Sequence, residues 1–221
     1  MPTLKIELLD YSLPGSGKGD SADFDETVRR DSDGLPLIAG KHLKGLIRQA
    51  LRCGSEWGWL PTIADSYQQP DEQNRPLDWS RLLFGASLLE DGRNQSDTHI
   101  DESERGMTAD EGYAGRLHIS NALLPQAVAD HLRNHPEQQS LLFVPIGSNR
   151  INEYGATVEH SRRRIEVVIP LTFYATLTPT DELPTNWQAV IQTVLPLISA
   201  IGKQRRRGYG RAQLTLLTEG V

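Results

Sequence analysis

The stretch Gly34–Arg52, G-L-P-L-I-A-G-K-H-L-K-G-L-I-R-Q-A-L-R, decides how the rest of the chain is organised. It begins with an extended apolar run from Leu35 to Ile38, because Pro36 disfavours a helix there. Gly40 then lets the backbone turn. From Lys41 onward, apolar residues recur at intervals of three and four, which predicts a helix with one buried face.

The same predicted helix carries a second, basic stripe formed by Lys41, Lys44, Arg48 and Arg52. A strand–glycine–helix turn that opens on lysines can offer backbone N–H groups and positive charge to a phosphate. The alternative is an ordinary amphipathic helix with a solvated basic face. A nucleoside-triphosphate loop is disfavoured, because His42 stands where that motif needs a hydroxyl.

Composition restricts the class of protein. The chain has 221 residues, of which 38% are hydrophobic and 24% charged, which is typical of a single globular domain. Cys53 is the only cysteine and the apolar runs are too short to cross a bilayer, so we expect a cytoplasmic protein with no membrane partner. The net charge of −6 argues against a generic nucleic-acid binder. Bases nevertheless gather at 41–52, 162–164 and 203–211, so a locally basic groove stays possible.

The pattern of elements predicts the fold class. Alternation or β-rich composition predicts strands at 3–9, 115–124, 164–177 with a break at Pro170, and 212–217. Helical spacing predicts helices at 41–52, 125–135 and 184–201, the last kinked at Pro196. The order favours an α+β protein with a ferredoxin-like (RRM-like) core and long loop insertions.

Two loops are acidic. Residues 20–33 carry six carboxylates, which could hold Mg²⁺ through hard oxygen ligands or could simply form a solvated loop. Residues 87–114 are polar, acidic and without periodicity, and we interpret them as a surface insertion in a single domain spanning 1–221.

Four segments, taken together and in order, resemble the RAMP superfamily, the repeat-associated proteins of CRISPR effector complexes. Residues 35–52 are similar to the family signature P-x-I-P-G-S-S-L-K-G-x-x-R, and residues 81–85, R-L-L-F-G, to its short L-F-G segment. Residues 150–168 resemble the I-N-R-x-T-x-x-A-x-x-x-x-x-x-E-x-V segment of type III backbone subunits. Residues 201–211, I-G-K-Q-R-R-R-G-Y-G-R, resemble the C-terminal loop G-G-x-x-S-R-G-Y-G-R.

This resemblance implies a backbone subunit of a type III CRISPR complex that stacks along guide RNA and cleaves the paired target RNA with a divalent metal such as Mg²⁺. Its implied partners are guide RNA, target RNA, other RAMP subunits and a large signature subunit. The family's catalytic aspartate falls on Asp25, which would also contact the metal, or on Asp23 if the loop register slips. Thr27 replaces a family proline, and Ala39, Lys41 and His42 replace the proline and two serines of the signature.

The resemblance also implies which residues touch RNA. A protruding hairpin at 148–163 would splay one nucleotide from the duplex, with Ile151, Tyr154 or Val158 as the wedge. The implied RNA-binding residues are basic side chains and one glycine that permits close backbone approach: Lys41, His42, Lys44, Arg48, Arg150, Lys203, Arg205, Arg206, Arg207, Gly208 and Arg211.

Two other functions stay open. The chain could be a purely structural RNA-binding subunit in which Asp25 is an ordinary loop acid. It could also be a stand-alone guide-RNA-processing nuclease that works without metal by acid–base chemistry, with His42 or His160 as the only candidate histidines.

Overall fold

The centre of the molecule is a four-stranded antiparallel sheet. The computed structural model describes residues 1–15, 24–64, 67, 78–85, 114–149, 152–158, 161 and 163–217. The sheet has the strand order β2-β5-β1-β6. Its strands are β1 (Thr3–Leu8), β2 (Leu117–Ile119), β5 (Thr172–Pro179) and β6 (Ala212–Leu217).

Alternation along β1 explains why the sheet has one buried face. Ile6 is fully buried and pairs with Phe173 on one side and Leu214 on the other. Lys5 and Glu7 point to the opposite face, where their side chains form an ion pair at 2.9 Å. The period of two therefore sends apolar side chains to the core and charges to the other face.

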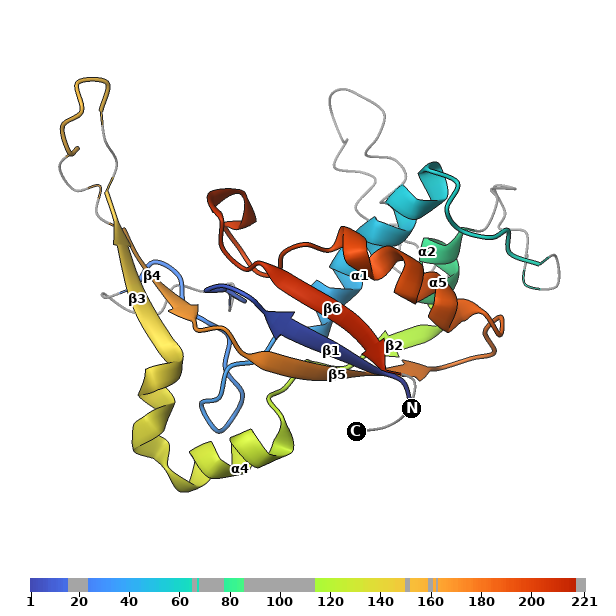
Figure 1. Ribbon diagram of the computed structural model, residues 1–221, viewed down its shortest axis with the longest axis horizontal. Coiled ribbons are helices and arrows are strands. Elements are labelled where there is room, and N and C mark those ends of the chain that lie inside the picture. Colours follow the sequence, from blue (N-terminus) through green and yellow to red (C-terminus); the bar gives the residue numbers. More distant parts are fainter. Residues whose placement is uncertain are drawn as a thin grey trace, which may run out of the picture.

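Helices cover the buried face of the sheet (Figure 1). They are α1 (Gly40–Glu56), α2 (Trp79–Phe84) and α5 (Trp187–Val194), and α5 continues into the 3₁₀ turn η5 (Leu195–Leu197). Their apolar stripes join the strands in one core. None of the helices in the described ranges is long and apolar enough to cross a bilayer.

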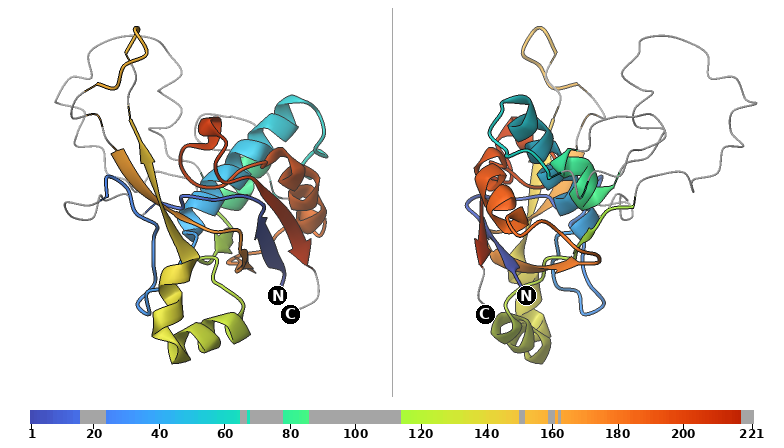
Figure 2. Two further views of the ribbon diagram at one scale, coloured as in Figure 1. Left: turned by 60° about the vertical axis from the view of Figure 1, so that its left-hand side comes forward. Right: turned by 90° about the vertical axis from the view of Figure 1, so that its right-hand side faces the viewer.

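A second, two-stranded sheet forms a hairpin that projects from the body (Figures 1 and 2). It consists of β3 (Phe143–Ser148) and β4 (Arg163–Val168), paired so that Ile146 faces Ile165. Helix α4 (Gln126–Asn134) and the 3₁₀ helix η4 (Pro136–Leu142) lead into β3.

The structure confirms the predicted α+β class, and β1, α1, β2, β5, α5 and β6 follow the predicted chain order β-α-β-β-α-β. The break predicted at Pro170 is confirmed, whereas two other predicted elements were too long. The β-rich run 164–177 divides at Pro170 into strands of two different sheets. The strand predicted at 115–124 is regular only from Leu117 to Ile119, and the helix predicted at 184–201 ends at Val194, because Pro196 cannot donate a helical hydrogen bond.

Candidate nucleic-acid interface

The start of α1 is fixed against the end of β2. A Cβ atom on Gly40 would overlap the carbonyl oxygen of Ile119, so only glycine fits this close approach. The Gly40 N–H donates to the Asn121 side-chain oxygen at 3.0 Å, which caps the helix from another segment because Ala39 offers no side-chain cap. Lys41 is consequently held exposed in the first helical turn.

His42 joins this helix start to the glycine-rich C-terminal loop. The Gly202 N–H donates to His42 Nε2 at 3.1 Å, so the neutral ring carries its proton on Nδ1. Burial lowers the pKa of His42 below its usual value, and the positive charge of Arg205 lowers the pKa further. Two basic segments that lie 160 positions apart in the chain therefore meet at one place.

The glycine-rich loop, residues 202–211, is shaped by left-handed backbone. Gly202 has φ 98°, and a Cβ there would lie 2.6 Å from the carbonyl oxygen of Leu13. Gly210 has φ 78°, and a Cβ there would overlap the carbonyl oxygen of Ile201. Between them, the exposed 3₁₀ turn η6 (Arg205–Arg207) is flanked by two residues with positive φ, Gln204 and Gly208. The loop thus presents three arginines on a defined turn.

Six of the predicted RNA-contacting cations are exposed, and one of them, Lys203, is paired with Glu26. Within the ranges that the structure describes, the side chains of the other five make no hydrogen bond or ion pair: Lys41, Arg205, Arg206, Arg207 and Arg211. Gly208 is also exposed, with open space where a Cβ would stand. These charges remain available to an anionic ligand.

Three other predicted cations are used inside the fold. Arg48 is half-buried and donates to the carbonyl oxygens of Phe84 at 2.8 Å and Gly85 at 3.1 Å, at the end of α2. Lys44 Nζ lies 5.9 Å from the centre of the Phe84 ring. Lys203 Nζ lies 3.2 Å from Glu26 Oε2. Arg48 therefore positions α2, while an RNA contact for each of these three residues stays a prediction.

Asp25 lies beside Arg164, the second residue of β4, near the end of the two strands from which the connecting loop of the hairpin leaves. Its N–H donates to the Arg164 carbonyl at 2.9 Å, and its Oδ2 accepts the Arg164 N–H at 2.8 Å. The side chain is exposed, and Oδ1 accepts no hydrogen bond among the described residues. The neighbouring Glu26 contacts Lys203, so the acidic loop at 20–33 adjoins the glycine-rich loop through this residue. Asp23, Arg150, Ile151, His160 and all but Ala114 of the insertion 87–114 lie outside the described residues.

A buried carboxylate that sequence analysis missed holds this loop on the hairpin. Glu166 is only 8% exposed, and its carboxylate accepts the Val28 N–H at 3.1 Å and the Arg30 guanidinium. The Arg30 guanidinium also stacks 3.8 Å from the centre of the Phe143 ring. An acid inside the otherwise apolar run I-E-V-V was the available signal, because a buried carboxylate needs partners.

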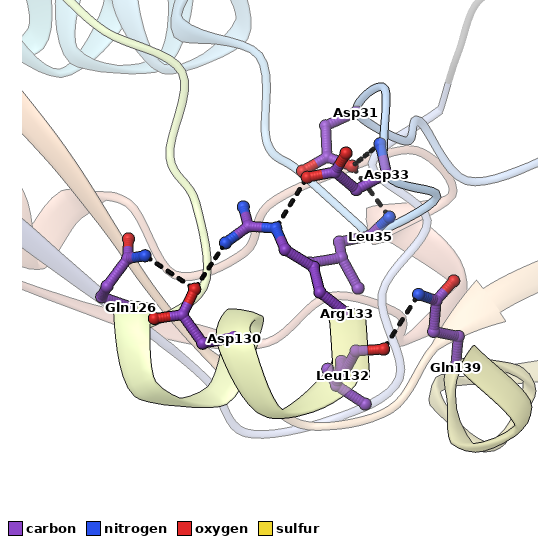
Figure 3. A network of polar contacts seen from close by, with 8 residues as sticks. All are labelled: Asp31, Asp33, Leu35, Gln126, Asp130, Leu132, Arg133 and Gln139. Atoms are coloured by element: carbon purple, nitrogen blue, oxygen red, sulfur yellow. Dashed lines mark hydrogen bonds and ion pairs between the residues drawn. The ribbon is translucent and has the colours of Figure 1, made fainter. Parts of the chain in front are cut away.

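The far end of the same loop is fastened to α4 (Figure 3). Arg133 donates to Asp33 at 2.7 Å and to Asp130 at 2.8 Å, and the bond to Asp33 is the main reason that the pKa of Arg133 is raised. Asp31 Oδ1 accepts the N–H groups of Asp33 and Leu35, both at 2.9 Å, which closes a tight turn. The loop is thus anchored at several points that follow Asp25 in the chain.

The described residues could hold a divalent metal only if most of its ligands came from water and substrate. No group of three or more His, Cys, Asp or Glu residues in the described part of the chain could hold a metal ion. Asp25 offers one uncommitted oxygen, whereas Glu26 is paired with Lys203. Mg²⁺ is commonly bound by one or two carboxylates, waters and substrate phosphate oxygens, and Asp25 fits that pattern.

The turn at 152–158 presents one large aromatic ring. Asn152 Oδ1 accepts the N–H groups of Tyr154 at 3.0 Å and Ala156 at 2.9 Å, and Gly155 has φ 77°. Tyr154 is 84% exposed on this ordered turn, whereas Val158 is half-buried. Of the predicted wedge residues that the structure describes, Tyr154 is therefore the more accessible.

The family model of the RAMP superfamily matches residues 5–213. No curated protein sequence is similar enough to match the chain.

Three solved structures resemble the chain over almost its whole length. A chain of the type III-B Cmr-beta complex in the apo state is 12% identical, with TM-score 0.59 over 99% of this chain and 97% of that chain. A chain of Cmr-beta bound to cognate target RNA is 11% identical, with TM-score 0.60 over 97% and 96%. A chain of a type IV-B CRISPR complex is 15% identical, with TM-score 0.55 over 100% and 91%. At these identities, the likeness shows the fold.

Proposed function

Because the chain belongs to the RAMP superfamily, we propose that it is a guide-RNA-binding backbone subunit of a type III CRISPR complex that cleaves the paired target RNA at Asp25 with a divalent metal. Its proposed partners are guide RNA, target RNA, further RAMP subunits and a large signature subunit. The structures that it resembles over almost their whole length come from such multi-subunit complexes, one of them with bound target RNA.

One observation carries the RNA-binding part of the proposal: the contact of His42 with Gly202 brings the first turn of α1 against the glycine-rich loop. The five exposed cations described above then lie on two adjoining segments of a chain whose net charge is −6. Positive charge concentrated on a globally acidic surface suits contacts to RNA phosphates, which fix position without reading sequence.

The chemistry proposed for Asp25 follows from its two oxygens. Oδ2 is fixed by the Arg164 N–H, so the carboxylate has a defined orientation, and Oδ1 is left to act on the substrate. A divalent metal bound there would neutralise charge that develops on the scissile phosphate. In the alternative role, Oδ1 would accept the proton of the 2′-hydroxyl as this oxygen attacks the phosphate in line. The bond from phosphorus to the 5′-oxygen then breaks, and the 5′-oxygen leaves with a proton from water.

Tyr154 would help the 2′-hydroxyl to reach the in-line position from which it attacks the phosphate. An RNA duplex keeps the 2′-hydroxyl out of line with its own phosphate, so one nucleotide has to be unstacked before cleavage. An apolar or aromatic wedge can do this by inserting between bases. The exposed Tyr154 ring, on a turn fixed by Asn152, has the required size and stiffness.

Guide-RNA binding is tested by its salt dependence. The double variant Arg206→Gln/Arg207→Gln removes two exposed cations from η6 and should lower the slope of log affinity against log salt by about 0.7 for each lost phosphate contact. Arg133→Gln is the control, because Arg133 is already paired with Asp33 and Asp130. An unchanged slope in the double variant would remove the glycine-rich loop from the RNA interface.

Cleavage is tested in the assembled complex with Asp25→Asn, which keeps an oxygen able to accept the Arg164 N–H. Target cleavage should fall at least ~100-fold while guide binding and assembly persist. Asp33→Asn, in the same loop, should leave cleavage intact. If cleavage persists in Asp25→Asn and in Asp23→Asn, the chain is a structural subunit.

The stand-alone processing nuclease is less well supported. His42 Nε2 already accepts the Gly202 N–H, so the ring lacks a free basic nitrogen on that side. Cutting of repeat RNA by the isolated chain in the presence of a chelator would nevertheless favour this alternative over ours.

A further inference from the structure

A pocket of about 380 Å³ lies beside the loop that carries Asp25. Its walls come from this loop, from η4 and from the body end of the hairpin. The lining residues that matter below are Phe24, Arg30, Gln139, Ser140, Phe143 and Glu166. Ligand pockets in proteins commonly run from about 300 to 1,000 Å³, so this pocket, near the lower end, has room for one small group rather than a peptide segment.

The pocket is charge-balanced. The Glu166 carboxylate and the Arg30 guanidinium neutralise each other across its wall. The five exposed cations of the RNA interface do not line it. A phosphate would find no net positive charge here, whereas an uncharged group would keep the pair intact.

The walls combine aromatic surface with polar acceptors. Phe24 and Phe143 supply ring surface. The Arg164 guanidinium lies over one face of Phe24 and the Arg30 guanidinium over one face of Phe143, so a planar group would stack on the ring surface that these leave. Gln139 donates its amide N–H to the Leu132 carbonyl at 3.1 Å, which leaves its Oε1 as an acceptor among the described residues (Figure 3). Ser140 donates to the Glu137 carbonyl at 3.2 Å, and its oxygen keeps lone pairs for a further bond. Stacking surface with acceptors at the edge matches a nucleobase, which offers a flat face and N–H donors.

The position of Phe24 links this pocket to the proposed reaction. Phe24 lines the pocket and Asp25 follows it directly, so their Cα atoms are about 3.8 Å apart. A nucleotide whose base is held against Phe24 would therefore be bound next to the residue that carries the proposed chemistry. Sequence-independent stacking is enough for this task, because every base has an aromatic face.

We propose that this pocket receives one unpaired nucleobase of the RNA strand that is cleaved at Asp25, and so holds the nucleotide that the hairpin has unstacked. This inference rests on the proposed function, since it takes the strand at Asp25 to be RNA. It goes further by assigning Phe24, Phe143, Gln139 and Ser140 to the base.

The test is photocross-linking in the assembled complex with guide RNA, with EDTA present to prevent cleavage. The target strand carries a single 5-iodouridine at successive positions, and cross-linked residues are identified by peptide sequencing. Ser140→Trp fills the pocket from an exposed position on η4. Leu141→Trp is the matched control, since Leu141 is the next residue, is 71% exposed and does not line the pocket.

We expect one target position to cross-link to Phe24 or Phe143, the Phe24 adduct to fall about tenfold in Ser140→Trp, and Leu141→Trp to match the wild type. Equal adducts in both variants, or adducts only at residues outside the pocket, would overturn the base pocket while RNA binding stands. Loss of a partner subunit from the Ser140→Trp complex with unchanged adducts would make the pocket a protein contact and also overturn it. If the wild-type complex binds no target strand, the proposed function itself fails.

Discussion

Replacing Glu166 with leucine should release the acidic loop from the hairpin. Leucine fills a similar volume but accepts no hydrogen bond, so the buried Val28 N–H and the Arg30 guanidinium lose their acceptor. We expect the loop 24–30 to detach locally and the whole chain to lose stability, because unpaired buried polar groups carry a desolvation cost.

The magnitude follows from the burial of each partner. A hydrogen bond to a charged group contributes about 1.5–3 kcal/mol, which applies to the buried Val28 N–H. The Arg30 side chain is 42% exposed, so its pairing with Glu166 adds only about 0–1 kcal/mol after solvent screening. The sum is about 2–4 kcal/mol, which lowers the unfolding midpoint by roughly 4–16 °C for a chain of this length.

Urea and thermal unfolding measure the global effect, and hydrogen exchange at the Val28 amide measures the local one. Glu7→Leu is the matched control, because Glu7 is a half-buried glutamate paired with Lys5 on the face of the sheet opposite the core. In the assembled complex, Glu166→Leu should reduce cleavage while guide binding persists, since the glycine-rich loop is anchored separately through His42. If Glu166→Leu unfolds like Glu7→Leu and the Val28 amide stays protected, the carboxylate does not hold the loop.

The remaining predictions concern backbone and protonation. Gly210→Ala should cost at least ~2 kcal/mol in urea unfolding, because its Cβ would overlap the Ile201 carbonyl oxygen at φ 78°, whereas Gly45→Ala, in an open helical position of α1, should gain about 1 kcal/mol. An equal effect of the two changes would contradict the loop geometry. Burial lowers the pKa of His42, so the unfolded chain binds more protons there, and stability should fall as pH drops below the ordinary value of about 6.5 toward the depressed pKa, since a protonated ring cannot accept the Gly202 N–H. His42→Gln should flatten this part of the stability profile, and an unaltered profile would show that another group titrates.

Local patterns predicted the parts of the fold that depend on local physics. The spacing of apolar residues after Gly40 predicted α1, and alternation at 3–9 predicted β1, because both patterns directly encode which face is buried. Helix α4 was also predicted within one residue at each end. Motif order placed Asp25, the start of α1 and the glycine-rich loop in one functional site, and the structure brings these segments together through Glu26, Lys203 and His42.

The parts that were not predicted depend on partners far away in the chain. Strand β3 escaped notice because Pro145 interrupts its pattern, yet proline is tolerated on an edge strand. The cap that Asn121 gives α1 and the bonds of Glu166 to Val28 and Arg30 join residues 81 and more than 130 positions apart. The periodicity of apolar residues within one segment cannot predict hydrogen bonds between such distant residues. The hydrogen bond from Arg48 to the Phe84 carbonyl oxygen at the end of α2 could not be predicted for the same reason.

Residues Asp25 and Glu26 run along the edge of β4. Glu26 forms a parallel bridge with Ile165, and Asp25 exchanges hydrogen bonds with Arg164. A hairpin that tilts must therefore carry the carboxylate with it. If the hairpin sets where an RNA strand is unstacked, the distance between that point and the cut is fixed by the distance between the hairpin and the Asp25 carboxylate. Under the proposed function, each subunit would then cut at a position set by its own place along the RNA, whichever bases lie between two cuts.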